Sequence, residues 1–505
     1  MLFIVLPPGA KPKQYGPEAA FLIETDWDDF GYRTTFRLLY RRSGTFAAVG
    51  QVKIGQFGMP ENGGPSLPER FDHLDSTFFS VGQDDTYYQA LRELGVASTV
   101  LAALCDIAFD PALFQEVQSE HVTRRSLLRS IQPSTVTRQF RRIARGGLRV
   151  IEYAFSYTAP PSDPIVVPLQ LDFKVFPDVS PPTNVHALIG SNGVGKTRLL
   201  QHLARAVADG SALPHEVGQV TNSLASLAND PLFTNLISIA FSAFDPLNPV
   251  RSTKGIHHAH VTLQRMPVAD PTSPGRNLAD PANQFAQVVQ TLTGARLERW
   301  QKAVSTLGSD PLFRDAGVGG AAPMIPGIPE VRSADPVSLF NGLSSGHKIV
   351  LLAITRLADL VSERTLVLID EPETHLHPPL LAAFVRALSD LLVDRNGVAI
   401  IATHSPVVLQ ETPRRCVWKL YRSGDVMKAE RPAIETYGEN VGILTHEAFG
   451  LEITRSGFHE EVRQAVADGM SYEEIIEWLE GQLGGEGRSL ARALIALRDR
   501  REGSR

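Results

Sequence analysis

An eight-residue stretch near the middle of the chain constrains the fold more than any other part of the sequence. Residues 190–197 are Gly-Ser-Asn-Gly-Val-Gly-Lys-Thr, with the spacing G-x-x-x-x-G-K-T, after the apolar run 185–189 and before a helical pattern. A strand, a glycine-rich turn and a helix start together point backbone N–H groups at a phosphate. The sequence therefore predicts a P-loop in an α/β fold. Its predicted nucleotide contacts are Gly190, Ser191, Asn192, Gly193, Val194, Gly195, Lys196, Thr197 and Arg198.

Two of these residues have distinct expected roles. Lys196 reaches the β and γ phosphates in such a loop, and the hydroxyl of Thr197 is a ligand for Mg²⁺. ATP and Mg²⁺ are therefore the predicted cofactors.

Length and composition limit the remaining possibilities. With 505 residues, 43% of them apolar, the chain is long enough for two or three structural units. The net charge of −6 means that nucleic acid could be contacted only through a local basic patch. Cys105 and Cys416 are far apart in sequence, which favours a reducing cytoplasm over a disulfide framework. No run of about 18 apolar residues predicts a membrane span, and residues 2–6 lack the features of a signal peptide.

Three segments are expected along the chain. The first is β-rich with a helical insert at about 85–149, the second is the P-loop core, and the third is a tail of three short helices. The segments are 1–164, 165–435 and 436–505. Strands are expected in the first segment at 20–24, 32–39 and 46–54. Ser471 and Glu474 have the spacing of a capping box in the tail.

A basic stretch lies within the helical insert. It contains no acidic residue and eight arginines: Arg124, Arg125, Arg129, Arg138, Arg141, Arg142, Arg145 and Arg149. Such a run either follows a nucleic-acid backbone or forms a helix face that pairs with carboxylates such as Glu116, Glu120 and Asp110. The paired helix face is the more common outcome, and nucleic acid is kept as a candidate partner.

Three later motifs could complete a nucleotide site. The first is Leu343, Ser344, Ser345 and Gly346, followed by His347 and an apolar helix. Serines at a helix start offer hydroxyl and N–H groups to an anion, although this pattern alone is more often an ordinary cap.

The second motif ends a continuous apolar strand, residues 365–369, with two adjacent carboxylates. Adjacent residues on a strand point to opposite sides. We therefore expect Asp370 to hold Mg²⁺ and Glu371 to face the water that attacks the γ-phosphate.

The third motif places His404 at the end of another apolar strand, 398–403. Ligands bind at the carboxyl ends of strands in an open parallel sheet, so His404 is predicted to contact the γ-phosphate or to orient the water. Glu371 and His404 are thus the candidate catalytic residues. The other histidine group, at 257–260, has no cysteine or carboxylate at ligand spacing and is predicted to be a polar loop.

In this order, the motifs resemble the ABC-type ATPase head over about residues 165–415. Residues 190–197 resemble its Walker A motif, 343–347 its signature, 366–371 its Walker B motif, and His404 its switch histidine. The resemblance implies a mixed sheet flanked by helices with an antiparallel β subdomain. It also implies a head-to-tail homodimer or higher assembly, in which Ser344 and Gly346 of one subunit contact the γ-phosphate held by the other. Glu371 would be the catalytic base.

The sequence after Glu371 narrows the resemblance. Asp370 begins the pattern Asp-Glu-Pro-Glu-x-His-Leu-His-Pro, which resembles soluble ATPases of the overcoming-lysogenization-defect (OLD) type and their relatives in the Septu, Gabija and retron anti-phage systems. Two departures stand out. His347-Lys348 replaces the usual Glu-Lys or Gln-Arg pair, and the segment 241–245 offers no glutamine, which leaves Asp245 as a substitute contact to Mg²⁺ or water.

The resemblance also predicts what the chain works with. OLD proteins carry a Toprim nuclease after the head, but no Toprim or HNH motif follows His404 here. We therefore expect a cytoplasmic ATPase subunit of an anti-phage complex that regulates a separate HNH-type or Toprim-type nuclease, without a membrane partner. A DNA-repair or chromosome-maintenance ATPase is the alternative, and the nucleotide-binding subunit of a transporter is less favoured.

Overall fold

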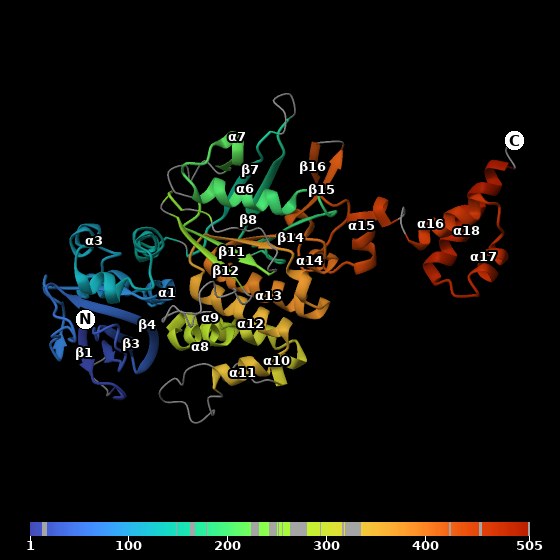
Figure 1. The fold of residues 1–505 in the computed structure, drawn as a ribbon. Helices are drawn as coiled ribbons and strands as arrows, with labels where there is room; N and C mark the ends of the chain where they lie inside the picture. Colours follow the sequence, from blue (N-terminus) through green and yellow to red (C-terminus); the bar gives the residue numbers. More distant parts are fainter. Residues whose placement is uncertain are drawn as a thin grey trace, which may run out of the picture.

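The computed structural model describes most of the chain. It covers residues 1–12, 18–147, 149–161, 167–177, 179–223, 232–241, 250, 252–254, 256–262, 280–292, 294–315, 318, 335–423, 426–453 and 457–502. Figure 1 shows an N-terminal lobe, a central core and a small helical unit at the C-terminal end, arranged in that order.

The core is built on a seven-stranded sheet with the order β12-β11-β13-β14-β9-β15-β16. Its strands are parallel except for β16, which is antiparallel to β15. The strands are β9 (Val185–Gly190), β11 (Asn235–Ala240), β12 (His257–Thr262), β13 (Thr365–Asp370), β14 (Val398–Thr403), β15 (Val417–Ser423) and β16 (Val426–Glu430).

Both faces of this sheet are covered. Every residue of β9, β13 and β14 is buried, as expected for continuous apolar strands in a parallel sheet. Alternate strand residues pack against α8 (Pro281–Thr291), α9 (Gly294–Leu307), α12 (Ser345–Leu360) and α13 (Pro378–Arg395) on one face. On the other face they pack against α6 (Lys196–Ala208) and a second sheet (Figure 1). The second sheet consists of β7 (Tyr153–Thr158), β8 (Gln170–Val175) and β10 (Gln219–Asn222). This architecture confirms the predicted α/β class with an antiparallel subdomain.

The core helices include the two that the sequence predicts, one after the P-loop and one after residues 343–347. They are α6 (Lys196–Ala208), α7 (Pro214–Val217), α8 (Pro281–Thr291), α9 (Gly294–Leu307), α10 (Pro311–Asp315), α11 (Pro336–Gly342), α12 (Ser345–Leu360), η6 (Pro372–His375), α13 (Pro378–Arg395), α14 (Pro406–Gln410), η7 (Arg414–Cys416) and α15 (Val441–Ile453). The predicted tail 436–505 includes α15, but Leu444 of this helix is fully buried in the core cluster. α15 therefore packs with the core.

The prediction of a polar loop at the histidine group was wrong. His257, His258 and His260 lie on β12, which pairs in parallel with β11 along its whole length. Two imidazole rings of β12 form hydrogen bonds to side chains of β11. His257 Nδ1 lies 3.2 Å from Asn235 Oδ1, and His258 Nε2 lies 3.2 Å from Ser238 Oγ. Backbone pairing at the sheet edge outweighs the polar character of the segment.

The N-terminal lobe is a six-stranded sheet with the order β5-β1-β2-β3-β4-β6, packed on short helices. Its strands are β1 (Leu2–Leu6), β2 (Glu18–Glu24), β3 (Thr35–Arg42), β4 (Thr45–Gln56), β5 (Arg70–Phe71) and β6 (Phe78–Gly82). Its helical segments are α1 (Asp85–Glu93), α2 (Ala97–Ala103), α3 (Pro111–Val117), η1 (Thr123–Leu127), α4 (Pro133–Thr135), η2 (Val136–Phe140) and α5 (Arg141–Ala144). The three strands predicted between residues 20 and 54 are confirmed.

The arginine-rich stretch is broken into short helical turns, and several of its side chains are occupied. Arg129 pairs with Asp29 at 3.0 Å, Arg142 pairs with Glu363, and Arg149 bonds to both Asp85 and Asp394 at 2.7 Å. These acids are distant in sequence and differ from the neighbouring acids that the sequence suggests. The contacts favour a structural use of the three arginines.

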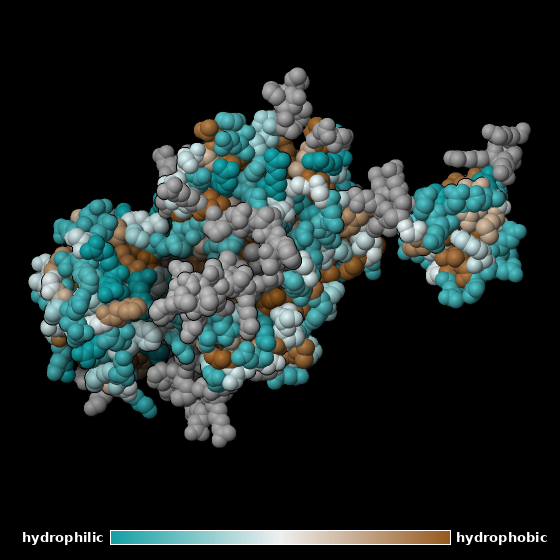
Figure 2. Space-filling model, in the orientation of Figure 1, coloured by the Kyte–Doolittle hydropathy of each residue, from teal (hydrophilic) through white to brown (hydrophobic). Residues whose placement is uncertain are grey.

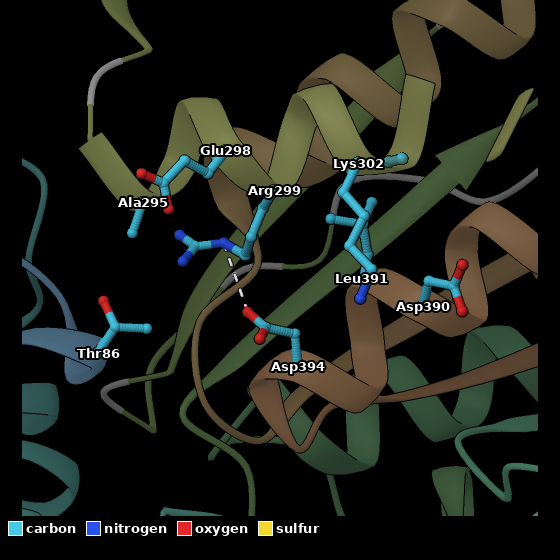
Figure 3. A pocket seen from close by; sticks show the side chains of 9 residues that line it. Thr86, Ala295, Glu298, Arg299, Lys302, Asp390, Leu391 and Asp394 are labelled. Atoms are coloured by element: carbon cyan, nitrogen blue, oxygen red, sulfur yellow. Dashed lines mark ion pairs between the residues drawn. The ribbon is translucent and has the colours of Figure 1, made fainter. Parts of the chain in front are cut away.

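A buried group of charges joins the lobe to the core. Arg395, at the end of α13, bonds to Asp84 and to Asp85 at the start of α1, and Arg299 of α9 bonds to Asp84 at 3.0 Å. A cavity of about 180 Å³ lies beside them (Figure 3), with Thr86 of α1 opposite Arg299 and Asp394. None of the residues that line this cavity belongs to the P-loop.

The C-terminal unit has its own small core. It consists of α16 (Phe458–Ala467), α17 (Tyr472–Trp478) and α18 (Gly485–Glu502), and it lies apart from the core in Figure 1. The predicted capping box is confirmed, because the side chains of Ser471 and Glu474 each bond to the other residue's backbone N–H. Among the described residues, no helix is both long enough and apolar enough to cross a membrane.

Candidate functional site

The P-loop connects β9 directly to α6. β9 ends at Gly190, whose Cα lies so close to β15 that a Cβ would meet the carbonyl oxygen of Leu420 at 2.3 Å. Gly193 and Gly195 have φ values of 74° and 107°, which side chains disfavour. α6 then begins at Lys196, so the free N–H groups of its first turn face the loop. The structure therefore contains the strand, glycine-rich turn and helix start that the sequence predicts.

Strand order brings the three later groups to the same edge of the sheet. β14 lies between β13 and β9, and the register sets Asp370 beside Ala402 and Thr403 beside Ile189. The carboxyl ends of these parallel strands therefore carry the Walker B residues, His404 and the P-loop side by side. The predicted site residues 190–198, 370, 371 and 404 share one edge.

Lys196, His404 and Glu371 form a contact group at this edge. Lys196 Nζ donates to the carbonyl oxygen of Gly190 at 2.9 Å and lies 2.6 Å from Nε2 of His404. The same Nε2 lies 3.2 Å from Oε1 of Glu371. A neutral imidazole nitrogen either accepts or donates a hydrogen bond. Nε2 therefore accepts from Lys196 or donates to Glu371, but it cannot do both.

Electrostatics favour neutral His404. Burial lowers its pKa, the charge of Lys196 lowers it further, and Glu371 and Glu373 act in the opposite direction. Glu373 also positions this histidine, because its Oε1 accepts the backbone N–H of His404. The sequence assigns no role to Glu373. Its place in the Asp-Glu-Pro-Glu pattern is the only signal that marks it.

The conformation of Glu371 corrects one step of the sequence interpretation. β13 ends at Asp370, and Glu371 adopts the left-handed conformation (φ 42°, ψ 57°) at the start of η6. The alternation of side chains along a strand therefore does not set its direction. Instead, its backbone N–H donates to the carbonyl oxygen of Ala402, and the left-handed turn directs the half-exposed carboxylate toward His404.

Residues for a magnesium ion are present at the P-loop. Thr197 offers a hydroxyl in the first turn of α6, and Asp370 offers a carboxylate at the end of β13. This donor set contains only oxygen, which Mg²⁺ prefers. Asp245, the proposed substitute contact, lies outside the described residues.

The signature residues lie at the start of α12. Ser344 is the N-cap, and Ser345 and Gly346 begin the helix behind Leu343. Ser344 Oγ lies 2.6 Å from Nδ1 of the buried His347, and Nε2 of the same ring lies 3.1 Å from Asp310 Oδ1. His347, which departs from the usual signature, thus orients the signature serine.

Comparison with known proteins identifies the family of this chain. Residues 280–410 match the family model described as "AAA domain, putative AbiEii toxin, Type IV TA system". Protein ea59 of Escherichia phage lambda is 37% identical over 511 residues, covering 95% of each chain. The chain belongs to the ea59 family. The segment matched by the family model identifies an AAA-type ATPase domain in this member of the ea59 family.

Solved structures share parts of the fold at low similarity. The SMC head domain from Thermotoga maritima is 12% identical with a TM-score of 0.30, and covers 56% of this chain and 99% of its own. UvrA2 from Deinococcus radiodurans is 14% identical with a TM-score of 0.25, and covers 53% and 35%.

Proposed function

We propose that the chain binds ATP with Mg²⁺ and hydrolyses it to ADP and phosphate in a site shared between two copies. The observation that carries this proposal is the meeting of the P-loop, Asp370, Glu371 and His404 at one sheet edge. Each group supplies one part of phosphoryl-transfer chemistry: a phosphate cradle, a metal ligand, a base and a polar contact.

The first step is a change in the contact between Lys196 and His404 when ATP binds. ATP draws Lys196 Nζ from His404 to the β and γ phosphates. Nε2 of His404 is then released from the lysine, and its alternative partner is Glu371. Glu371 accepts the proton of the attacking water as the bond between the γ phosphorus and the bridging oxygen breaks. Thr197 and Asp370 would hold Mg²⁺, and the bound ion would neutralise negative charge on the phosphates.

The catalytic assignment can be tested with three variants. Lys196→Ala is expected to lose ATP binding, measured with a fluorescent ATP analogue. Glu371→Gln is expected to bind ATP but to hydrolyse it at least about 100-fold more slowly, because the base is lost. The control Glu116→Gln changes an exposed residue of α3 and should behave as wild type. ATP hydrolysis by Glu371→Gln at the wild-type rate would show that another residue is the base.

A mixing experiment tests the shared site. Lys196→Ala and Ser344→Ala should each be inactive alone, because every composite site contains one substitution. In a mixture, heterodimers contain one site with both substitutions and one intact site. Random pairing therefore restores about one quarter of wild-type activity. No recovery on mixing, with both variants folded, would contradict the sharing of a site between copies.

We further propose that ATP-dependent dimerisation regulates a separate nuclease in anti-phage defence. Two observations support this finer role: the Asp-Glu-Pro-Glu-x-His-Leu-His-Pro pattern and a relative that a phage encodes. In a plaque assay, Glu371→Gln should change protection against phage relative to wild type. Equal plaque numbers with and without the wild-type gene, together with co-purification of DNA-repair proteins, would favour the repair alternative.

A further inference from the structure

Three side chains near the signature form a cluster that nucleotide chemistry does not explain. Asp310 lies in the turn between α9 and α10, His347 in the first turn of α12, and His377 at the N-cap of α13. One ligand atom from each lies within 4.8 Å of the others. Asp310 and His347 are buried, whereas the side chain of His377 is 52% exposed. The cluster is thus preformed on its inner side and open to solvent on its outer side.

We propose that Asp310, His347 and His377 bind one divalent transition-metal ion of the Zn²⁺ class, with a fourth position open to water. Two imidazoles and a carboxylate are the ligands of open zinc sites, in which neighbouring ligand atoms are about 3.4 Å apart. His347 Nε2 lies 3.1 Å from Asp310 Oδ1, and His377 Nε2 lies 4.0 Å from Asp310 Oδ2. A small inward movement of the exposed His377 would complete the set. The nitrogen ligands separate this site from the oxygen-only Mg²⁺ site.

Surrounding contacts hold two of the ligands in place. The backbone N–H of Leu312 donates to Asp310 Oδ1 at 2.9 Å. Nδ1 of His347 bonds to Ser344, and its ring packs against Phe313 with centroids 4.8 Å apart. Outer contacts of this kind orient metal-bound histidines. His377 is held more weakly, because its Nδ1 accepts only a 3.3 Å hydrogen bond from the N–H of Leu380. A metal ion bound to Nε2 of His377 would place the ring proton on Nδ1. Nδ1 could then no longer accept the N–H of Leu380, and the metal–nitrogen bond would take over the role of holding the ring.

Metal binding would also act on the signature serine. When Nε2 of His347 donates to Asp310, Nδ1 accepts the hydroxyl proton of Ser344. When Nε2 binds a metal, Nδ1 carries the proton and donates to Ser344 Oγ, so the serine O–H is released for another acceptor. In the proposed function, on which this step rests, that acceptor is the γ-phosphate held by the other copy.

Co²⁺ provides a spectroscopic test that is independent of ATP. Full-length protein without a histidine tag is treated with a chelator and titrated with Co²⁺, whose visible absorption reports tetrahedral coordination. We expect one ion per chain, displaced by Zn²⁺. His377→Ala and Asp310→Asn should weaken binding by more than the roughly 10–100-fold typical of outer-contact substitutions. The matched control His375→Ala, two residues away and outside the cluster, should bind as wild type.

Two results would overturn the proposal: no tetrahedral Co²⁺ spectrum in the wild type, or the same affinity in His377→Ala. Because His377 is exposed, its variant should fold, and Asp310→Asn keeps a hydrogen-bond acceptor for His347. ATPase rates with and without Zn²⁺ form a separate measurement. If the protein binds the metal but its ATPase rate is the same with and without Zn²⁺, the metal site stands. The proposed effect of the metal on Ser344 is then wrong.

Discussion

His186 on β9 and His404 just after β14 lie on neighbouring strands, and burial lowers the pKa of both imidazoles. At His186 the pKa falls to about 3, and the ring packs edge-on against Phe173 with centroids 5.2 Å apart. At His404 the charge of Lys196 adds to the effect of burial. Each ring is therefore neutral near pH 7, but only His404 is open to the nucleotide edge.

Acid should destabilise the protein through His186. The unfolded chain binds a proton at this residue below about pH 6.5, whereas the folded protein excludes it down to about pH 3. The stability it contributes is therefore present above pH 6.5 and is lost as the pH falls. The loss is about 2 kcal/mol at pH 5, which His186→Phe should remove. Urea unfolding at pH 7 and pH 5 measures the difference. His215→Phe, at an exposed position on α7, should retain the wild-type dependence.

At the level of secondary-structure elements, the N-terminal lobe is held partly by a contact of α1 with α9 and α13. Arg395 is buried and bonds to two carboxylates at the start of α1. Burial would raise the pKa of Asp84, but Arg395 and Arg299 outweigh it and keep the pKa well below its usual range. The joint is therefore ionic and shielded from solvent.

Removing Arg395 should destabilise the joint strongly. Arg395→Ala leaves two buried carboxylates without their main partner, which costs about 3–5 kcal/mol. Arg386→Ala on the exposed side of the same helix removes a 3.2 Å bond to Tyr437 and should cost less than about 1 kcal/mol. Thermal unfolding compares the two. Equal losses of stability would show that the buried group does not hold the lobe.

At the level of the whole molecule, the unit α16–α18 is the most separate part. Its buried residues form a cluster of their own, while Trp478 and Leu497 are 53% and 55% exposed. Figure 2 shows hydrophobic residues on the visible face of this unit. We propose that this unit, with its own core and these exposed apolar side chains, holds a partner.

Deletion of residues 454–505 tests this role. The cut lies beyond α15, so the core should keep its ATP affinity and its unfolding temperature. A co-expressed nuclease partner should no longer co-purify. Retention of the nuclease by the soluble truncated chain would place its contact elsewhere. In the intact chain, Trp478→Ala changes one exposed residue of the unit. Reduced co-purification of the nuclease with this variant would place the contact at Trp478.

The sequence predicts the core well because its signals are local. β9, β13 and β14 are continuous apolar runs, and the P-loop, Walker B and His404 motifs lie at their ends. Long-range contacts escape such patterns. The partners of Arg129 and Arg142 are 100 and 221 residues away, and Asp310 is 37 residues from His347. The left-handed turn at Glu371 likewise depends on a contact outside its own segment, the hydrogen bond to Ala402 of β14.

α13 joins features that were described separately. Its 18 residues span about 27 Å, with His377 of the metal-ligand cluster at one end and Arg395 of the ionic joint at the other. A buried α-helix resists bending, so its two ends move as one rigid body. The N-terminal lobe contacts the C-terminal end of α13 through Arg395. At the other end of the helix, His377 lies next to His347, which bonds to Ser344. We therefore infer that a displacement of the lobe at Arg395 would be passed along α13 to the residues around Ser344.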